Sequence, residues 1–190
     1  LKGALAPLAD EYDYIVLDCP PALNLLTLNG LVAADAVVIP MQCEYYALEG
    51  LSDLINTIKK VRMHLNPAIE IAGLLRTMFD PRNNLANEVS AQLSAHFGDR
   101  VYNTVIPRNV RLAEAPSFGK AALYYDRESR GALAYLALAG ELIRREEEEA
   151  MAIGSDVPDA SEESFDVSTA SADSAPLPEP SPAPEPTLAD

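Results

Sequence analysis

Apolar residues along this chain follow two kinds of pattern. Apolar runs occupy residues 14–17, 36–41, 69–78 and 101–106. Runs that do not alternate with polar residues are typical of strands covered on both faces, as in parallel sheets. Apolar residues at helical spacing predict helices over 23–33, 48–65, 84–97 and 129–148. Gly98 is the expected end of the third helix, and Ser129 or Asp126 is the expected cap of the last.

The alternation of strands and helices predicts an α/β fold with a mostly parallel sheet flanked by helices. Crossovers between parallel strands are right-handed, and the helices they contain cover the faces of the sheet. Ligands of such sheets bind beyond the carboxyl ends of the strands. The residues directly after each apolar run are therefore the first candidates for chemistry.

Charge divides the chain near residue 146. The whole sequence has 190 residues and a net charge of −15. Residues 1–145 hold all 14 Lys and Arg against 16 Asp and Glu, whereas residues 146–190 hold 13 acidic residues and no basic one. Whole-chain charge argues against a DNA-binding protein, because DNA repels negative surfaces. Residues 1–145 are nearly neutral, so their charge does not argue against DNA binding.

Composition predicts one folded domain over 1–148 and a disordered tail over 149–190. The tail is acidic and rich in Pro, Ser and Ala, and it has too few apolar groups to offset the entropy of ordering. It either keeps the protein in solution or docks on a partner. No apolar run is long enough to span a membrane. The two cysteines, Cys19 and Cys43, cannot form a disulfide framework and favour a cytoplasmic setting.

Candidate chemistry follows the first apolar run. Asp18 ends that run and is followed by Cys-Pro-Pro. A carboxylate at the end of a buried strand can reach Mg²⁺ through water in phosphate-binding folds, although an Asp that forms a turn has the same pattern.

Arginines follow the third and fourth runs. Arg82 comes after one run, and Arg108 and Arg111 come after the other. Three arginines at one end of a sheet could bind phosphates, or each could be a solvated surface residue. The second run is followed by Tyr45, Tyr46 and Glu49, which could form a contact surface or simply pack as an amphipathic turn.

No glycine-rich phosphate loop is present in the sequence. Neither GxxxxGK[ST] nor GxGxxG occurs, and the pair Gly119-Lys120 has no glycine-rich approach. The first residue is not Met, so we expect the chain to begin inside a longer protein.

Several motifs together resemble the ParA/Soj family of chromosome- and plasmid-partitioning ATPases. They are DCPP at 18–21, QCEYYALEGL at 42–51, TMFDPRNNLANEV at 77–89 and IPRNVRLAEAPS at 106–117. The resemblance covers about residues 1–146 and implies a P-loop NTPase-like fold of the deviant Walker type. It makes residues 1–148 the carboxyl-terminal two-thirds of an ATPase domain.

The resemblance also assigns roles to single residues. Asp18 matches the Walker B aspartate near Mg²⁺, which it reaches through water. Pro107 and Asn109 match positions that contact adenine. Arg82 and Arg111 match positions that bind DNA phosphates. Tyr45, Tyr46 and Glu49 fall near the dimer face.

For the intact protein, the resemblance implies an ATP-dependent switch. ATP and Mg²⁺ would bind, a homodimer would form around the nucleotide, and the dimer would bind double-stranded DNA without sequence preference. A ParB-type partner would stimulate hydrolysis. The protein would be cytoplasmic and associated with the nucleoid. A MinD-like relative would carry a basic membrane helix, whereas this chain ends in acid, which anionic lipid repels.

The chain departs from the family at its amino-terminal end. The first strand and the KGGxGKT loop have no counterpart, so we expect the chain alone not to hydrolyse ATP. That strand belongs in the middle of the family's sheet, and its loss would expose apolar edges. One explanation is a truncated sequence. The alternative is a non-enzymatic paralogue that binds DNA or ParB and has lost nucleotide switching.

Overall fold

The computed structural model describes residues 1–20 and 22–154. The tail predicted to be disordered lies outside the described residues from 155 onward. The last helix, α7 (Arg130–Gly154), runs six residues past the expected end at 148. The domain boundary at 148 stays a prediction.

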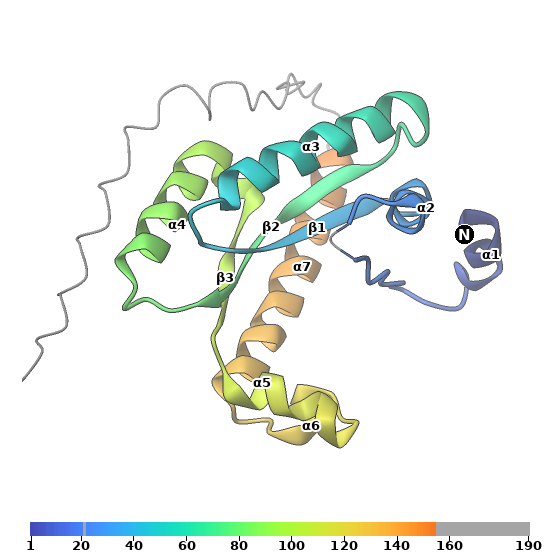
Figure 1. Cartoon of the computed structure of the whole chain (residues 1–190). Coiled ribbons are helices and arrows are strands. Elements are labelled where there is room, and N and C mark those ends of the chain that lie inside the picture. Colours follow the sequence, from blue (N-terminus) through green and yellow to red (C-terminus); the bar gives the residue numbers. More distant parts are fainter. Residues whose placement is uncertain (21, 155–190) are drawn as a thin grey trace, which may run out of the picture.

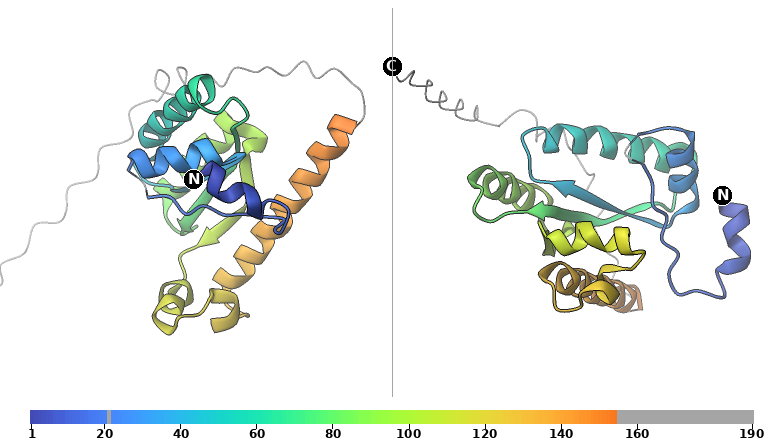
Figure 2. Two further views of the ribbon diagram at one scale, coloured as in Figure 1. Left: turned by 90° about the vertical axis from the view of Figure 1, so that its right-hand side faces the viewer. Right: turned by 60° about the horizontal axis from the view of Figure 1, so that its bottom comes forward.

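The centre of the structure is a parallel sheet of three strands in the order β1–β2–β3 (Figure 1). The strands are β1 (Ala36–Gln42), β2 (Glu70–Phe79) and β3 (Val101–Pro107). The chain crosses from β1 to β2 through α3 (Ala47–His64) and from β2 to β3 through α4 (Asn84–Phe97). Because right-handed crossovers between strands in consecutive order lie on one side, α3 and α4 cover the same face. Helix α7 lies on the opposite face, as the turned view in Figure 2 shows. The α/β fold with a parallel sheet is confirmed.

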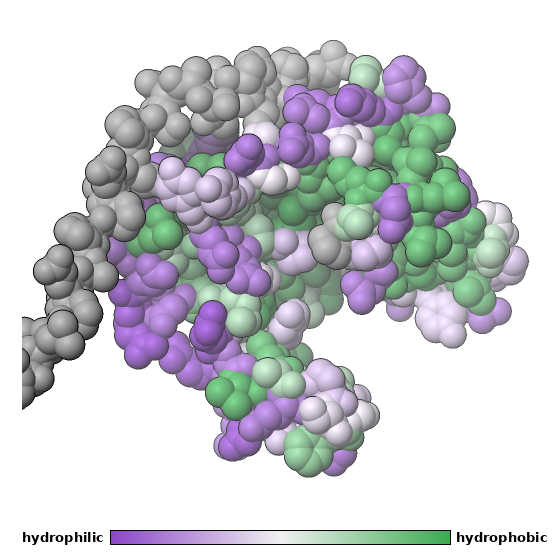
Figure 3. Space-filling model, viewed as in Figure 1, coloured by the Kyte–Doolittle hydropathy of each residue, from purple (hydrophilic) through white to green (hydrophobic). Residues whose placement is uncertain are grey.

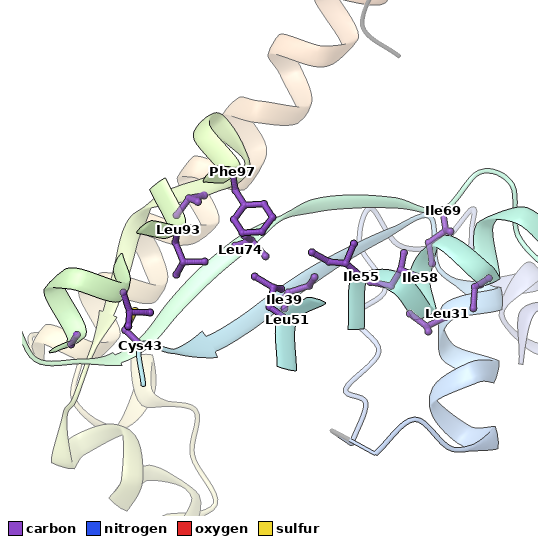
Figure 4. Close-up of a cluster of buried hydrophobic side chains, with 14 residues drawn as sticks. Leu31, Ile39, Cys43, Leu51, Ile55, Ile58, Ile69, Leu74, Leu93 and Phe97 are labelled. Atoms are coloured by element: carbon purple, nitrogen blue, oxygen red, sulfur yellow. The ribbon is translucent and has the colours of Figure 1, made fainter. Parts of the chain in front are cut away.

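The main core lies between the sheet and α3 and α4 (Figure 4). Buried residues of α3 recur at helical spacing, at Leu51, Ile55 and Ile58, and this explains why the helix forms and which face it buries. They meet buried side chains from β1, β2 and α4, namely Ile39, Leu74, Leu93 and Phe97. A smaller core on the other face joins the sheet to α7 through Leu75, Tyr102, Ile106 and Leu138.

The predicted helix ends are confirmed at α4 and α7. Gly98 has a φ of 49° and ends α4, in a backbone region that favours glycine. The Ser129 hydroxyl accepts a hydrogen bond from the Ala132 N–H and begins α7. Asp126 is not the cap, because only its carbonyl takes part, as the acceptor for Ser129.

The prediction of a strand over 14–17 is wrong. These residues pair with no strand among those the structure describes, and Val16 is 89% exposed. A single extended run is stabilised only when its backbone groups find a neighbouring strand. Here the run instead lies beside the second half of α7, where the Tyr14 hydroxyl donates to the Glu146 carboxylate.

Two short helical turns, α1 (Lys2–Leu5) and η1 (Ala6–Leu8), precede this run, and α2 (Leu25–Ala33) follows it. Asn24 caps α2 by accepting from the N–H groups of Leu26 and Thr27. Buried Asn66 donates to the carbonyls of Leu31 and Ala34 and so fixes the end of α2 beside the start of β2. The carboxyl-terminal end of α2 therefore lies at the amino edge of the sheet.

Strand β3 is irregular, and α7 supports it there. The register between β2 and β3 shifts between Leu74 and Arg76. Glu141 of α7 accepts from the N–H groups of Asn103 and Thr104 at 2.8 Å each, and from Arg145 at 2.8 Å. Burial raises the pKa of Glu141, but the hydrogen bonds from Thr104, Asn103 and Arg145 outweigh it and lower the pKa to about 2. An ionised carboxylate thus satisfies backbone donors that the ladder leaves unpaired.

Candidate functional site

The loops that follow β2 and β3 meet at the carboxyl edge of the sheet. Phe79 lies opposite Pro107 in the register, and the Arg108 N–H donates to the Phe79 carbonyl at 3.2 Å. The segment from Asp80 to Asn83 therefore lies beside the segment that begins at Arg108. This is the edge at which parallel α/β sheets bind ligands.

A groove of about 390 Å³ opens at this edge. Strand ends form part of its wall and the first turns of α7 form the rest; the lining residues are Phe79, Pro81, Val105, Pro107, Arg130, Leu133 and Ala134. The lining is mostly apolar, with Arg130 as its charged member. A mostly apolar groove with a proline ring in its wall fits the face of a base better than a charged group.

Asn109 stands just outside the groove and is half-buried. Its side-chain oxygen accepts from the Arg111 N–H at 2.8 Å and so caps the short helix α5 (Val110–Glu114). None of the described residues accepts a hydrogen bond from its Nδ2 group. The cap thus fixes the amide plane and leaves donor hydrogens for a ligand.

Arg82 is the most exposed of the arginines predicted to bind DNA. Its side chain is 88% exposed and makes two hydrogen bonds to the carboxylate of Asp80, at 2.9 and 2.8 Å. The side-chain and backbone hydrogen bonds from Arg82 lower the pKa of Asp80 to about 2, and the charge of Arg108 adds to the effect. The guanidinium is therefore held at the tip of the loop, with Arg108 near its partner Asp80.

Arg111 has a different environment. It forms ion pairs with Glu114 at 2.9 Å and with Asp126 at 3.2 Å, and Glu114 also accepts from the Tyr125 hydroxyl. The hydrogen bond to Glu114 raises the pKa of Arg111. These pairs tie α5 to the turn after α6 (Ala122–Tyr125), with η3 (Ala115–Phe118) between them. Sequence reasoning treated Arg82 and Arg111 alike, whereas the structure shows that Arg111 also has a structural role.

Hydrophilic side chains gather over this part of the molecule. Figure 3 shows them over the loop between β2 and α4, whereas the projecting lobe of α5 and α6 is a mixture of hydrophilic and hydrophobic residues. The surface around α2, at the other end of the sheet, is mainly hydrophobic.

Asp18 is not brought to this edge. It is exposed, and its neighbour Cys19 contacts Gly30, where an added Cβ would lie 2.7 Å from the cysteine sulfur. Gly30 is in the last turns of α2, at the amino edge of the sheet. No described contact joins Asp18 to Pro107 or Asn109, so its predicted role in the Mg²⁺ shell stays a prediction. Within the described residues, no group of three or more His, Cys, Asp or Glu could hold a metal ion.

Tyr45 and Tyr46 lie between β1 and α3, at the same edge as the groove. Their rings are exposed and meet edge to face, with centroids 4.9 Å apart. Glu49 follows on the exposed face of α3. The segment is thus a surface and not part of the core, and its predicted place at a dimer face stays a prediction.

Sequence reasoning missed Phe79, Arg130 and Leu133 in the groove wall. Phe79 is the last residue of β2 and Arg130 the first of α7. Their positions at element ends were a usable signal, because ends of strands and helices form the ligand edge of such sheets. The hydrophobic pattern could not predict which of these ends come together, because that depends on how α7 packs against the sheet. No helix that could span a bilayer is found in the described part of the chain.

Comparison with known proteins gives the relationship of the chain. A family model described as an AAA domain matches residues 1–71. The chromosome partitioning protein ParA of Myxococcus xanthus is 56% identical over 146 residues, covering 77% of this chain and 52% of the relative. The sporulation initiation inhibitor protein Soj of Bacillus subtilis is 58% identical over 142 residues, covering 75% of this chain and 56% of the relative.

A solved structure supports the fold. Cobyrinic acid a,c-diamide synthase of Mycobacterium smegmatis, with bound ATP analog and magnesium, matches with a TM-score of 0.63 and 36% identity, covering 75% of this chain and 52% of that one. This is the P-loop NTPase-like fold expected from the sequence. The chain spans about half the length of the curated relatives it matches. Within that span, it belongs to the ParA/Soj family of chromosome-partitioning proteins.

Proposed function

We propose that this protein is a ParA-type partitioning ATPase, and that the groove beside Pro107 receives the adenine of ATP. The observation that carries the proposal is an apolar groove at the carboxyl edge of the sheet, with Pro107 in its wall and a fixed Asn109 amide next to it. A proline ring can pack on a base, and an amide can pair with the base's polar edge. The Mycobacterium smegmatis relative was solved with an ATP analog and magnesium.

Magnesium would accompany the nucleotide. Oxygen ligands and water suit Mg²⁺, and Asp18 is the residue we propose for its water shell. That assignment rests on the DCPP motif, because the described Asp18 is exposed and away from the groove. When bound, the metal would neutralise phosphate charge, while Pro107 and Asn109 would hold the base.

The remaining parts of the proposal concern partners. Arg82 and Arg111 bind the phosphates of double-stranded DNA without reading sequence, because guanidinium groups match phosphate geometry. The protein forms a homodimer with ATP, for which the exposed tyrosines beside Glu49 are a candidate surface. A ParB-type protein stimulates hydrolysis, and the protein acts on the nucleoid in the cytoplasm.

Filling the groove should weaken nucleotide binding. Leu133 lines the groove, so Leu133→Trp would place an indole where the base is proposed to lie. We expect the affinity for a ribose-labelled fluorescent ATP analogue to fall by about tenfold, or about 1.4 kcal/mol. The measurement is made on the full-length gene product in the presence of Mg²⁺.

Leu136→Trp is the matched control. Leu136 is on the same helix and is also exposed, but it does not line the groove. Its variant should bind the analogue like the parent protein. Equal affinities for the parent and both variants would reject the groove as the adenine site.

A further inference from the structure

Charge is unevenly distributed along α7. The end of the helix that starts at the groove lies among exposed cations, here called the basic rim: Arg82, Arg108, Arg111, Lys120, Arg127 and Arg130. Four acidic residues, Asp80, Glu114, Asp126 and Glu128, lie in the same loops and turns, so the local balance stays positive. The other end of α7 carries Glu146, Glu147, Glu148 and Glu149, all exposed.

We propose that residues 155–190 bind the basic rim of their own chain and compete there with DNA. This segment holds nine Asp and Glu and no Lys, Arg or His. It follows the end of α7, which carries the glutamate run, and these like charges repel it from that end of the helix. The rim offers guanidinium groups, which pair with carboxylates as well as with phosphates.

The segment is long enough to reach the rim. Helix α7 has 25 residues, so its two ends are about 37 Å apart at 1.5 Å per residue. Thirty-six residues follow Gly154, and a chain of that length can reach at most roughly 130 Å. This reach exceeds the separation of the helix ends, so the segment can contact the rim of its own chain, and such a tethered contact has an effective concentration on the order of millimolar.

The binding is electrostatic and therefore weak at high salt. Exposed ion pairs contribute little individually, but several acidic groups on one tether act together. The part of the proposal that concerns DNA rests on the proposed function; contact between tail and rim does not. The tail would lower the affinity of the rim for DNA, and DNA at a sufficient concentration would displace the tail.

Helix α3 ends in a second basic cluster, Lys59, Lys60 and Arg62, at the amino edge of the sheet. Its three cations compare with six at the rim. If the tail bound to this second cluster, the proposal would be wrong, and the variant Arg62→Glu would reveal such binding.

The test is a distance measurement within the full chain. Cys19→Ser removes the exposed thiol, and Ser117→Cys and Ser181→Cys place one dye in η3 beside the rim and one in the tail; Cys43 is buried. We expect energy transfer that falls steeply between about 20 mM and about 500 mM NaCl, as the Debye length shortens from roughly 20 Å to roughly 4 Å. Changing the nine acidic residues to Asn and Gln should remove the salt dependence, and so should Arg82→Glu combined with Arg108→Glu.

Arg62→Glu should leave the transfer unchanged. Loss of transfer with Arg62→Glu but not with the rim variant would place the tail on α3 and overturn the proposal, as would transfer that does not depend on salt. In a parallel DNA-binding measurement, the neutral-tail variant should bind double-stranded DNA about fivefold more tightly. If neither form binds DNA, the proposed function fails while the distance result still decides the tail contact; equal DNA affinities would refute the competition.

Discussion

Replacing Glu141 with Gln is expected to lower the free energy of unfolding by about 3 kcal/mol, because breaking a buried pair leaves the other charge uncompensated. Glu141 is 3% exposed and accepts from two backbone N–H groups and from Arg145. The NH₂ group of a glutamine in its place would face N–H donors instead of accepting from them, and Arg145 would lose its carboxylate partner. Urea unfolding at neutral pH measures the change.

Glu148→Gln is the control on the same helix. Its carboxylate is exposed and lies 3.9 Å from Arg144, so its loss should change the free energy of unfolding by less than about 0.5 kcal/mol. Acid should reproduce the larger effect. The pKa of Glu141 is lowered from 4.5 to about 2 in the folded protein. Its stabilisation is complete above pH 4.5 and is lost as the pH falls toward 2. A gap between parent and Glu141→Gln that does not shrink over this range would contradict the assignment.

Arg82→Glu should abolish DNA retention and spare ATP binding. The arginine is at the tip of the β2–α4 loop, and reversal would set a second carboxylate beside Asp80 where a phosphate is proposed to bind. We expect the affinity for random-sequence double-stranded DNA to fall more than about tenfold. The salt dependence of binding should become shallower, because a protein with fewer phosphate contacts releases fewer counterions from the DNA when it binds. Fluorescence polarisation at several salt concentrations, with ATP and Mg²⁺ present, measures it.

The control is Arg62→Glu, which changes the charge equally at the opposite edge of the sheet. Similar losses in both variants would mean that overall charge, and not the position of Arg82, decides DNA binding. Loss of ATP binding in Arg82→Glu would point to damage at the groove. Arg111→Glu is a poorer probe, because it would gather three carboxylates with Glu114 and Asp126 and disturb α5 and α6.

Most of the architecture could be predicted from the sequence because it depends on local patterns. Helix α4 matches its expected range, and β2 differs by one residue at each end. Residue spacing predicted the buried face of α3, and the Ser129 and Gly98 helix ends follow from capping chemistry. The convergence of the segments after Phe79 and Pro107 follows from parallel strand order.

The sequence did not predict the environment of residues that contact parts of the chain far away in sequence. Residues 14–17 have the composition of a strand, but a strand also requires a partner, and the run has none among the described residues. Asp18 therefore does not reach the carboxyl edge. The helical pattern over 129–148 contained no indication that Glu141 would be buried against the backbone of β3. Arg111 gave no sign of its two carboxylate partners, because Asp126 becomes its neighbour only through the turn after α6.

In the proposed function, a nucleotide controls whether this protein holds DNA. The decisive measurement is the retention of random-sequence double-stranded DNA by the full-length gene product in three states: with ATP and Mg²⁺, with ADP and Mg²⁺, and without nucleotide. We expect retention to be at least about tenfold stronger with ATP than in the other two states. Equal retention in all three states would contradict it and support the nucleotide-independent paralogue.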